Sequence, residues 1–252
     1  MPRRLNLQFL LLATLLPIAL AAQSGDDIAR MIDQRRVPKD VTTDLTMTLT
    51  SRSGASRTLT VHSVRLGEKK QIIWFLAPAD DRGVAFLSIE HDDRDDELRM
   101  WLPSFKKMRR ISASKKGDSF MGSDLSYEDM TSRNLNDYTY LLQGEETIDG
   151  VEYWVLESVP KPELRSSYSR IVSWVRQSDA LILKENYFDR AGNLLRERTI
   201  EAQEIGGYTL PVRMFVRNVQ KEHTTEMIFD KIEVDTGVKE NLFHERNLRR
   251  LP

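Results

Sequence analysis

Alternation of apolar and polar side chains is the feature that most constrains how this chain can fold. In residues 41–50 the apolar Leu45, Met47 and Leu49 alternate with threonines, as in a strand with one buried and one exposed face. Similar segments recur along most of the chain, separated by short polar turns such as Ser53-Gly54. An amphipathic helix needs a period of 3.6 residues instead, so the sequence predicts a mainly antiparallel β protein.

About a dozen segments have this strand pattern, and two regions depart from it. The expected strands cover residues 41–50, 57–66, 71–76, 84–89, 98–102, 108–112, 151–158, 168–175, 181–188, 194–204, 208–218 and 224–234. Near the N-terminus, residues 24–36 predict a short helix, with Ser24 as its N-cap and Pro38 just beyond its end. Residues 126–142 lack alternation, so we expect them to be irregular, with one or two short helical turns.

Many sequential antiparallel strands favour one large curved sheet, and such a sheet has a concave face. We expect residues 113–145, the central irregular part of the chain, to cover that face as a lid. Within them, Ser126 and Asp129 have the spacing of a helix capping box.

The first residues have the pattern of a secretory signal peptide. Arg3 and Arg4 form a positive region, an apolar run follows, and Ala19-Leu20-Ala21 is a cleavage motif. The alternative is an N-terminal membrane anchor, for which the run is short. The chain has no Cys, so it has neither a lipid-bearing cysteine nor a disulfide framework. We expect residues 1–21 to be removed and residues 22–252 to form a single domain in the bacterial periplasm.

The net charge is small, but charges are strongly segregated along the chain. The formal net charge is −1, and it becomes −3 when Arg3 and Arg4 leave with the signal peptide, so attraction to nucleic acid is not expected. Residues 90–97 hold six acids and one Arg, whereas residues 98–116 hold seven cations and no acid. Large apolar side chains are interleaved with the cations. This mixture predicts a surface that meets a partner both apolar and anionic.

Catalytic and metal-binding motifs are not evident. The four histidines are far apart in sequence and there is no Cys, so the spacing of a zinc site is absent. His91 and the acids of residues 92–96 lack the alternating ligands and the Gly of a calcium loop, and a solvated acidic turn is the simpler interpretation. The G-x-S-x-G, Walker and G-x-G-x-x-G motifs are missing. We therefore expect no enzyme activity, no cofactor and no metal site.

Residues 97–130 are the most unusual stretch and supply the candidate binding residues. Methionine and aromatic side chains are expected to line an apolar cavity or its rim, namely Met100, Trp101, Phe105, Met108, Phe120 and Met121. The alternative is that such side chains only pack under a hairpin. Four cations are expected to contact headgroups or an acidic partner, unless they form an ordinary solvated face: Lys106, Lys107, Arg109 and Arg110. A structural hinge or cap of the lid is expected at Gly122, Ser123, Asp124, Tyr127 and Asp129.

Motifs in this stretch resemble those of outer-membrane lipoprotein-sorting proteins, a periplasmic family of longer relatives of the lipoprotein carrier LolA. They are W-L-P at 101–103, K-K-M-R-R-I at 106–111 and S-F-M-G-S-D-L-S-Y-E-D at 119–129. Downstream, Y-S-R-I at 168–171 and K-E-N-Y-F-D at 184–189 look like hairpins of the family's second half. The resemblance extends over nearly the whole mature chain.

The resemblance implies a LolA/LolB-like fold, an incomplete (half-open) antiparallel β-barrel of about eleven strands with short helices covering its concave face. It also implies a carrier that binds acyl chains of a lipoprotein or free lipid in an apolar cavity and touches membrane surfaces transiently. Members are often associated with RND/MMPL-type inner-membrane transporters, so such a partner is expected. The alternative is a non-transporting accessory or regulatory binding subunit of such a transporter. The cavity arginine of LolA matches no position here through a shared motif.

Overall fold

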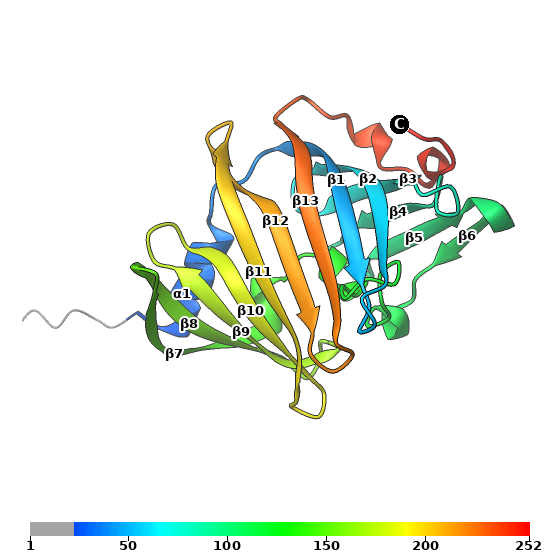
Figure 1. The fold of residues 1–252 in the computed structure, drawn as a ribbon. Helices are drawn as coiled ribbons and strands as arrows, with labels where there is room; N and C mark the ends of the chain where they lie inside the picture. Colours follow the sequence, from blue (N-terminus) through cyan, green and yellow to red (C-terminus); the bar gives the residue numbers. More distant parts are fainter. Residues whose placement is uncertain (1–22) are drawn as a thin grey trace, which may run out of the picture.

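The computed structural model describes residues 23–252, which form one open, curved antiparallel sheet of thirteen strands (Figure 1). The strands are β1 (Asp40–Thr50), β2 (Ser56–Leu66), β3 (Lys70–Ala77), β4 (Ala85–Ile89), β5 (Glu97–Leu102), β6 (Lys107–Arg110), β7 (Tyr138–Ile148), β8 (Val151–Pro160), β9 (Tyr168–Arg176), β10 (Leu181–Asp189), β11 (Leu194–Ile205), β12 (Tyr208–Asn218) and β13 (His223–Val234). The mainly β, half-open fold is therefore confirmed. The expected signal peptide, residues 1–21, lies outside the described residues.

The strand order explains how the central part of the chain reaches the concave face. From β1 the chain runs outward through successive hairpins to β6 at one edge, and from β7 at the other edge it returns to β13, which pairs with β1. The two edge strands, β6 and β7, are consecutive in sequence although they lie at opposite ends of the sheet (Figure 1). Residues 111–137, here called the crossing segment, therefore have to travel the width of the sheet.

The prediction of irregular structure for residues 126–142 is wrong in its last part, because β7 begins at Tyr138. An edge strand pairs on one side only, and β7 is largely exposed, including Leu141. It therefore lacks the apolar alternation that marks the inner strands. The cover of the concave face consequently ends at residue 137 rather than 145. Within it, three short 3-10 turns form at Ala113–Lys115, Glu128–Met130 and Leu135–Asp137.

The helix α1 (Gly25–Asp33) covers part of the concave face beside β7 and β8. Ser24 is its N-cap, as predicted: Ser24 Oγ accepts from Asp27 N at 3.2 Å, and the Asp27 carboxylate accepts from Ser24 N at 3.0 Å. The apolar face of α1 buries Ile28 and Ala29 against Trp154 and Leu156. The helix thus closes the β7–β9 side of the cavity described below.

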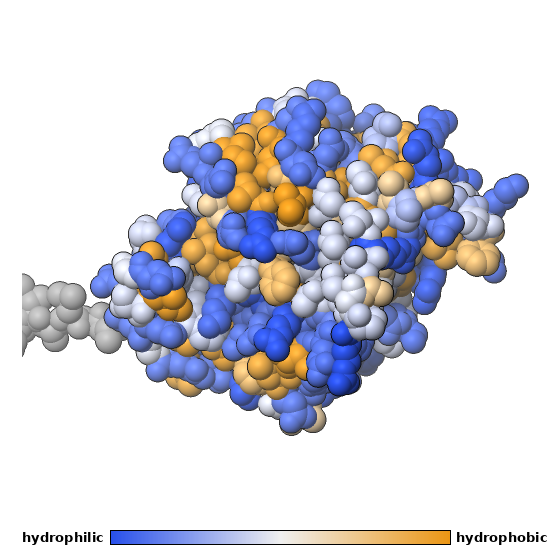
Figure 2. All heavy atoms as spheres, in the orientation of Figure 1, coloured by the Kyte–Doolittle hydropathy of each residue, from blue (hydrophilic) through white to orange (hydrophobic). Residues whose placement is uncertain are grey.

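The opposite, convex face of β2–β5 is covered by the C-terminal residues 238–248. Two 3-10 turns, Glu240–Leu242 and Glu245–Arg249, place Phe243 and Leu248 against Val64, Ile72 and Trp74. This explains why β3 is buried on both faces. In the view of Figure 2, hydrophilic side chains dominate the surface, with smaller apolar areas between them. Among residues 23–252, no helix combines the length and apolar character needed to cross a membrane.

Candidate functional site

A cavity of about 970 Å³ lies between the concave face of the sheet and its cover. Strands from both halves of the sheet contribute to its wall, and α1 and the crossing segment close it. This volume is at the upper end of the range for small-molecule sites. Much of the wall is aliphatic, thioether or aromatic: Leu45, Met47, Val61, Ile73, Phe120, Leu156, Ile171, Met214, Met227 and Phe229.

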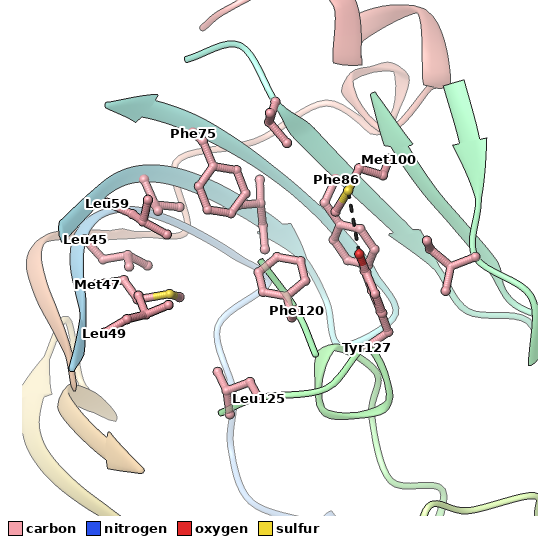
Figure 3. Close-up of a cluster of buried hydrophobic side chains, with 14 of the residues drawn as sticks. Leu45, Met47, Leu49, Leu59, Phe75, Phe86, Met100, Phe120, Leu125 and Tyr127 are labelled. Carbon is pink, nitrogen blue, oxygen red and sulfur yellow. Dashed lines mark hydrogen bonds between the residues drawn. The ribbon is translucent and has the colours of Figure 1, made fainter. Parts of the chain in front are cut away.

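Apolar side chains of the crossing segment hold it against the sheet. Figure 3 shows Phe120, Leu125 and Tyr127 directed from the crossing segment toward side chains of the β1–β5 half. The Phe120 ring is 1% exposed, and its centroid lies 5.2 Å from that of Phe86 and 5.9 Å from that of Phe75. These contacts make the segment part of the core rather than a loose loop.

The local shape of the crossing segment comes from a tight turn around Gly122. Phe120 N donates to Leu125 O at 2.7 Å, and Ser123 N donates to Phe120 O at 2.9 Å. Gly122 has φ +78°, in the left-handed region that glycine adopts without strain. Ser123 Oγ caps the turn by donating to Phe120 O at 2.6 Å. The turn presents Phe120 to the sheet on one side and Asp124 to β13 on the other.

Buried carboxylates anchor the crossing segment to the second half of the sheet. Asp124 Oδ2 accepts from Thr225 Oγ1 at 2.8 Å and lies 2.7 Å from His223 Nδ1, both on β13. Asp129 pairs with Arg196 of β11, and both side chains are at most 5% exposed. Burial by itself raises the pKa of Asp129, but Arg196 and hydrogen bonds from Ser126 outweigh it and hold that pKa below its usual range. Buried ion pairs and hydrogen bonds therefore hold the crossing segment on the concave face, in addition to its apolar contacts.

A second group of buried charges faces the cavity from β9–β11. Glu185 is fully buried and accepts from Ser173 Oγ at 3.0 Å and from Tyr187 OH at 2.8 Å. Two arginines share its carboxylate: Arg133 of the crossing segment, at 2.6 Å, and Arg198 of β11. Arg133, Arg198, Tyr187 and Ser173 all line the cavity. The cavity is therefore apolar over much of its wall, with a pair of arginines on its β9–β11 side.

On the other half of the sheet, two of the five acids that precede β5 form ion pairs. Lys69 Nζ lies 2.6 Å from Asp92 Oδ2, and Lys116 Nζ lies 2.7 Å from Asp96 Oδ2. Glu90 accepts from Ser132 N at 3.0 Å, and burial raises its pKa against the effect of that bond. Within residues 23–252, no group of three or more His, Asp or Glu side chains is placed to hold a metal ion.

Comparisons with known proteins agree with this architecture. A family model described as "Uncharacterized protein" matches residues 67–250. The crystal structure of a DUF1329 family protein from Desulfovibrio piger is 30% identical with a TM-score of 0.85, covering 89% of this chain and 97% of that one. The chain belongs to the DUF1329 family. A search of curated proteins found no match.

Two further solved structures relate this DUF1329 family member to lipoprotein-sorting proteins. A domain from Vibrio parahaemolyticus, described as an outer membrane lipoprotein-sorting protein, is 28% identical with a TM-score of 0.82, covering 90% of this chain and 98% of that one. A LolA superfamily protein from Nitrosomonas europaea is 20% identical with a TM-score of 0.73, covering 90% and 100%, and shows the fold alone. The predicted resemblance and the LolA-like fold are confirmed.

The six predicted ligand-binding side chains are divided between two faces of the sheet. Of these six described residues, only Phe120 lines the cavity. Met100 and Met121 pack in the apolar cluster of Figure 3, where Tyr127 OH contacts Met100 Sδ at 3.6 Å. Trp101 and Met108 pack with the C-terminal residues on the convex face, and Phe105 is 74% exposed at the β5–β6 turn. Adjacent residues of a strand point to opposite faces, so Met100 and Trp101 cannot share one cavity.

The four predicted headgroup contacts lie together on the β5–β6 hairpin. Lys106, Lys107, Arg109 and Arg110 are all exposed at the β6 edge of the sheet. None of them has an ion-pair partner among the described residues. With the exposed Phe105 they form the basic hairpin, residues 105–110. The predicted lid motif, in contrast, is buried or half-buried apart from Gly122, and it supplies the turn and the anchors described above.

The buried charges of β10 and β11 are functional candidates that the sequence interpretation missed. Arg196 and Arg198 occupy alternate positions of β11, as do Glu185 and Tyr187 of β10. Residues two apart share one face of a strand, and that face here is the concave one. Charged residues at inward positions were the available signal.

Proposed function

We propose that this protein is a periplasmic carrier that binds acyl chains of a lipid or lipoprotein in its cavity and moves them between membranes. The observation that supports this most directly is the cavity of about 970 Å³ between the concave sheet and the crossing segment. Its wall is rich in methionine, leucine, isoleucine and phenylalanine, side chains that adapt to flexible chains. The likeness to a lipoprotein-sorting domain from Vibrio parahaemolyticus agrees with this role.

The free energies involved are consistent with carriage by burial alone. Moving an acyl chain from a membrane into water costs about 0.8 kcal/mol per methylene, or about 12 kcal/mol for fifteen methylenes. A carrier has to offer comparable apolar surface and still be able to release the chain. An open sheet meets both needs, because its strands do not close around the cavity and a chain can leave without breaking their hydrogen bonds. We propose binding rather than catalysis, with no cofactor.

Location and partners are part of the same proposal. A cleaved signal peptide at residues 1–21 delivers the domain of residues 22–252 to the periplasm. The basic hairpin makes transient contact with anionic membrane surfaces, since its four cations are exposed and Phe105 can enter the headgroup region. An RND/MMPL-type inner-membrane transporter is the proposed partner that supplies or accepts the cargo.

The carrier function can be tested on the full-length mature protein with a charge placed in the cavity wall. Met227 of β13 lines the cavity, whereas its neighbour Ile228 is 43% exposed and does not line it. We expect gently purified wild-type protein to carry lipid in native mass spectrometry and to bind the uncharged probe N-phenyl-1-naphthylamine. Met227→Glu should lose both properties, whereas the matched control Ile228→Glu should keep both. Wild-type protein without lipid that also fails to bind the probe would refute the carrier function.

A further inference from the structure

Three arginines gather around one buried tyrosine at the β9–β11 side of the cavity. The guanidinium carbons of Arg133, Arg196 and Arg198 lie 5.7, 4.2 and 5.4 Å from the centroid of the Tyr187 ring. They come from the crossing segment and from β11, so only the folded chain brings them together. Like charges gathered around one ring repel one another unless carboxylates compensate them.

The compensation within the described residues is incomplete. Two carboxylates pair directly with these three cations: Asp129 with Arg196, and Glu185 with both Arg133 and Arg198. Asp129 is already occupied by Arg196, Tyr168 and Ser126. Counted by direct ion pairs, the three arginines have two carboxylates, and Arg133 and Arg198 share one of them. Glu128, which also lines the cavity, accepts hydrogen bonds from Ser166 and Ser167 and pairs with none of the three arginines.

Arg198 has an unused hydrogen-bond donor next to the cavity. Its Nε, like that of Arg196, is buried without a hydrogen-bond partner among the described residues, although the donors of a buried guanidinium are usually all used. Of these two arginines, Arg198 is the one that lines the cavity. Burial, together with the nearby Arg133, lowers the pKa of Arg198 to about 10. Arg133 and Arg198 both line the cavity, so a ligand inside it can reach them. An acyl chain that displaces water from Arg133 and Arg198 raises the desolvation cost of these two charged groups. A ligand that also carries an anion offsets this cost.

We propose that the cavity takes an amphiphile with an anionic headgroup, a carboxylate or a phosphate, which Arg133 and Arg198 bind inside the cavity. Guanidinium groups bind both anions through paired, charge-assisted hydrogen bonds. The acyl chain then follows the apolar wall formed by neighbours such as Ile171 and Ile182. The β2–β5 side of the cavity is less suited to an anion, because its two lysines, Lys69 and Lys116, already pair with Asp92 and Asp96. Glu68 and Glu90 also line that side and lie on the same wall as its one arginine, Arg65.

This inference rests on the proposed carrier function and narrows its cargo. The acylated cysteine of a bacterial lipoprotein has ester, thioether and amide groups but no charge. A site in which two arginines share one buried carboxylate therefore favours a free anionic lipid over a lipoprotein. The preference for an anion is a property of the cavity alone and does not require the transporter or the basic hairpin.

The test compares amphiphiles that share one chain and differ in the head. Dodecanoate, dodecyl phosphate, dodecanol and inorganic phosphate are each titrated against mature protein loaded with N-phenyl-1-naphthylamine, at pH 7.5. We expect at least one anionic amphiphile to bind about tenfold or more tightly than dodecanol, and inorganic phosphate to bind far more weakly. Arg198→Met, which leaves Glu185 paired with Arg133, should reduce the preference to about threefold or less while dodecanol binding is kept.

The controls separate the possible failures. Arg133→Met should act like Arg198→Met, and Arg217→Met, which removes an exposed cation of β12, should leave the preference unchanged. If dodecanol equals both anionic amphiphiles, the anionic-headgroup site is refuted while the carrier function stands. If no amphiphile displaces the probe, the carrier function fails first. A preference that persists in both arginine variants, or inorganic phosphate that binds as tightly as the amphiphiles, also overturns the proposal.

Discussion

Phe120 is the side chain whose removal tests most directly how the crossing segment is held. In Phe120→Ala, a ring that is 1% exposed and within 6 Å of three other rings is removed from the core. Truncations of buried Phe to Ala cost about 3–5 kcal/mol, partly from lost burial and partly from the cavity left behind. A domain typically has only about 5–15 kcal/mol of stability, so the effect is a large share of the total.

The assay is urea unfolding followed by tryptophan fluorescence, together with hydrogen–deuterium exchange of the crossing segment. We expect the free energy of unfolding to fall by about 3–5 kcal/mol with an unchanged urea dependence. Exchange should accelerate more in the crossing segment, residues 111–137, than in β10 or β11. Phe105→Ala is a matched control, because it removes the same ring where it is 74% exposed, and its effect should stay within about 0.5 kcal/mol. Equal effects of the two substitutions would refute the assignment of Phe120 as an anchor.

Two further predictions concern charges. Asp129→Asn should lower the free energy of unfolding by about 3–5 kcal/mol at pH 7, because it leaves Arg196 buried without its partner. The pKa of Asp129 is lowered in the folded protein. The stabilisation that ionised Asp129 gives to the fold is therefore fully present above the pKa of the unfolded chain, about 3.9, and is lost as pH falls through the folded pKa. A difference in free energy of unfolding between wild type and Asp129→Asn that does not shrink in acid contradicts this. Replacing the four cations of the basic hairpin by glutamine should weaken binding to phosphatidylglycerol vesicles by about tenfold or more at low salt, since each cation contributes on the order of 1 kcal/mol. Binding is measured by co-sedimentation with the vesicles. Wild-type protein that binds uncharged phosphatidylcholine vesicles equally tightly contradicts this prediction.

The strands were predictable wherever the sheet has one buried and one exposed face. In β1, the odd positions Leu45, Met47 and Leu49 are buried, and every expected strand is found with its ends shifted by a few residues at most. The edge strand β7 was missed because few of its side chains are buried, so its sequence lacks the alternation of apolar and polar residues that predicts a strand. The cap Ser24 and the paired Ser126 and Asp129 were readable because capping depends on residues three apart.

The site was harder to predict than the fold. The unusual stretch at residues 97–130 does contain the turn and the anchors of the crossing segment, but its most conspicuous side chains, Trp101 and Phe105, lie away from the cavity. Which face of β5 is concave depends on the curvature of the whole sheet, and curvature has no local signature in β5 itself. The cavity wall instead comes mostly from ordinary core positions of strands that lie far apart in the sequence.

The sequence by itself determined the class of structure, because period-two alternation, turn residues and caps act between near neighbours. It also determined the basic hairpin, whose four cations lie within five residues of sequence. Only the tertiary structure decided which face of the sheet is covered and what the cavity contains. Arg133, Glu185 and Arg198 meet there because β6 and β7 are opposite edges of one open sheet, so the chain between them must cross over β10 and β11. Such an arrangement is set by strand order and curvature, which no short stretch of sequence records.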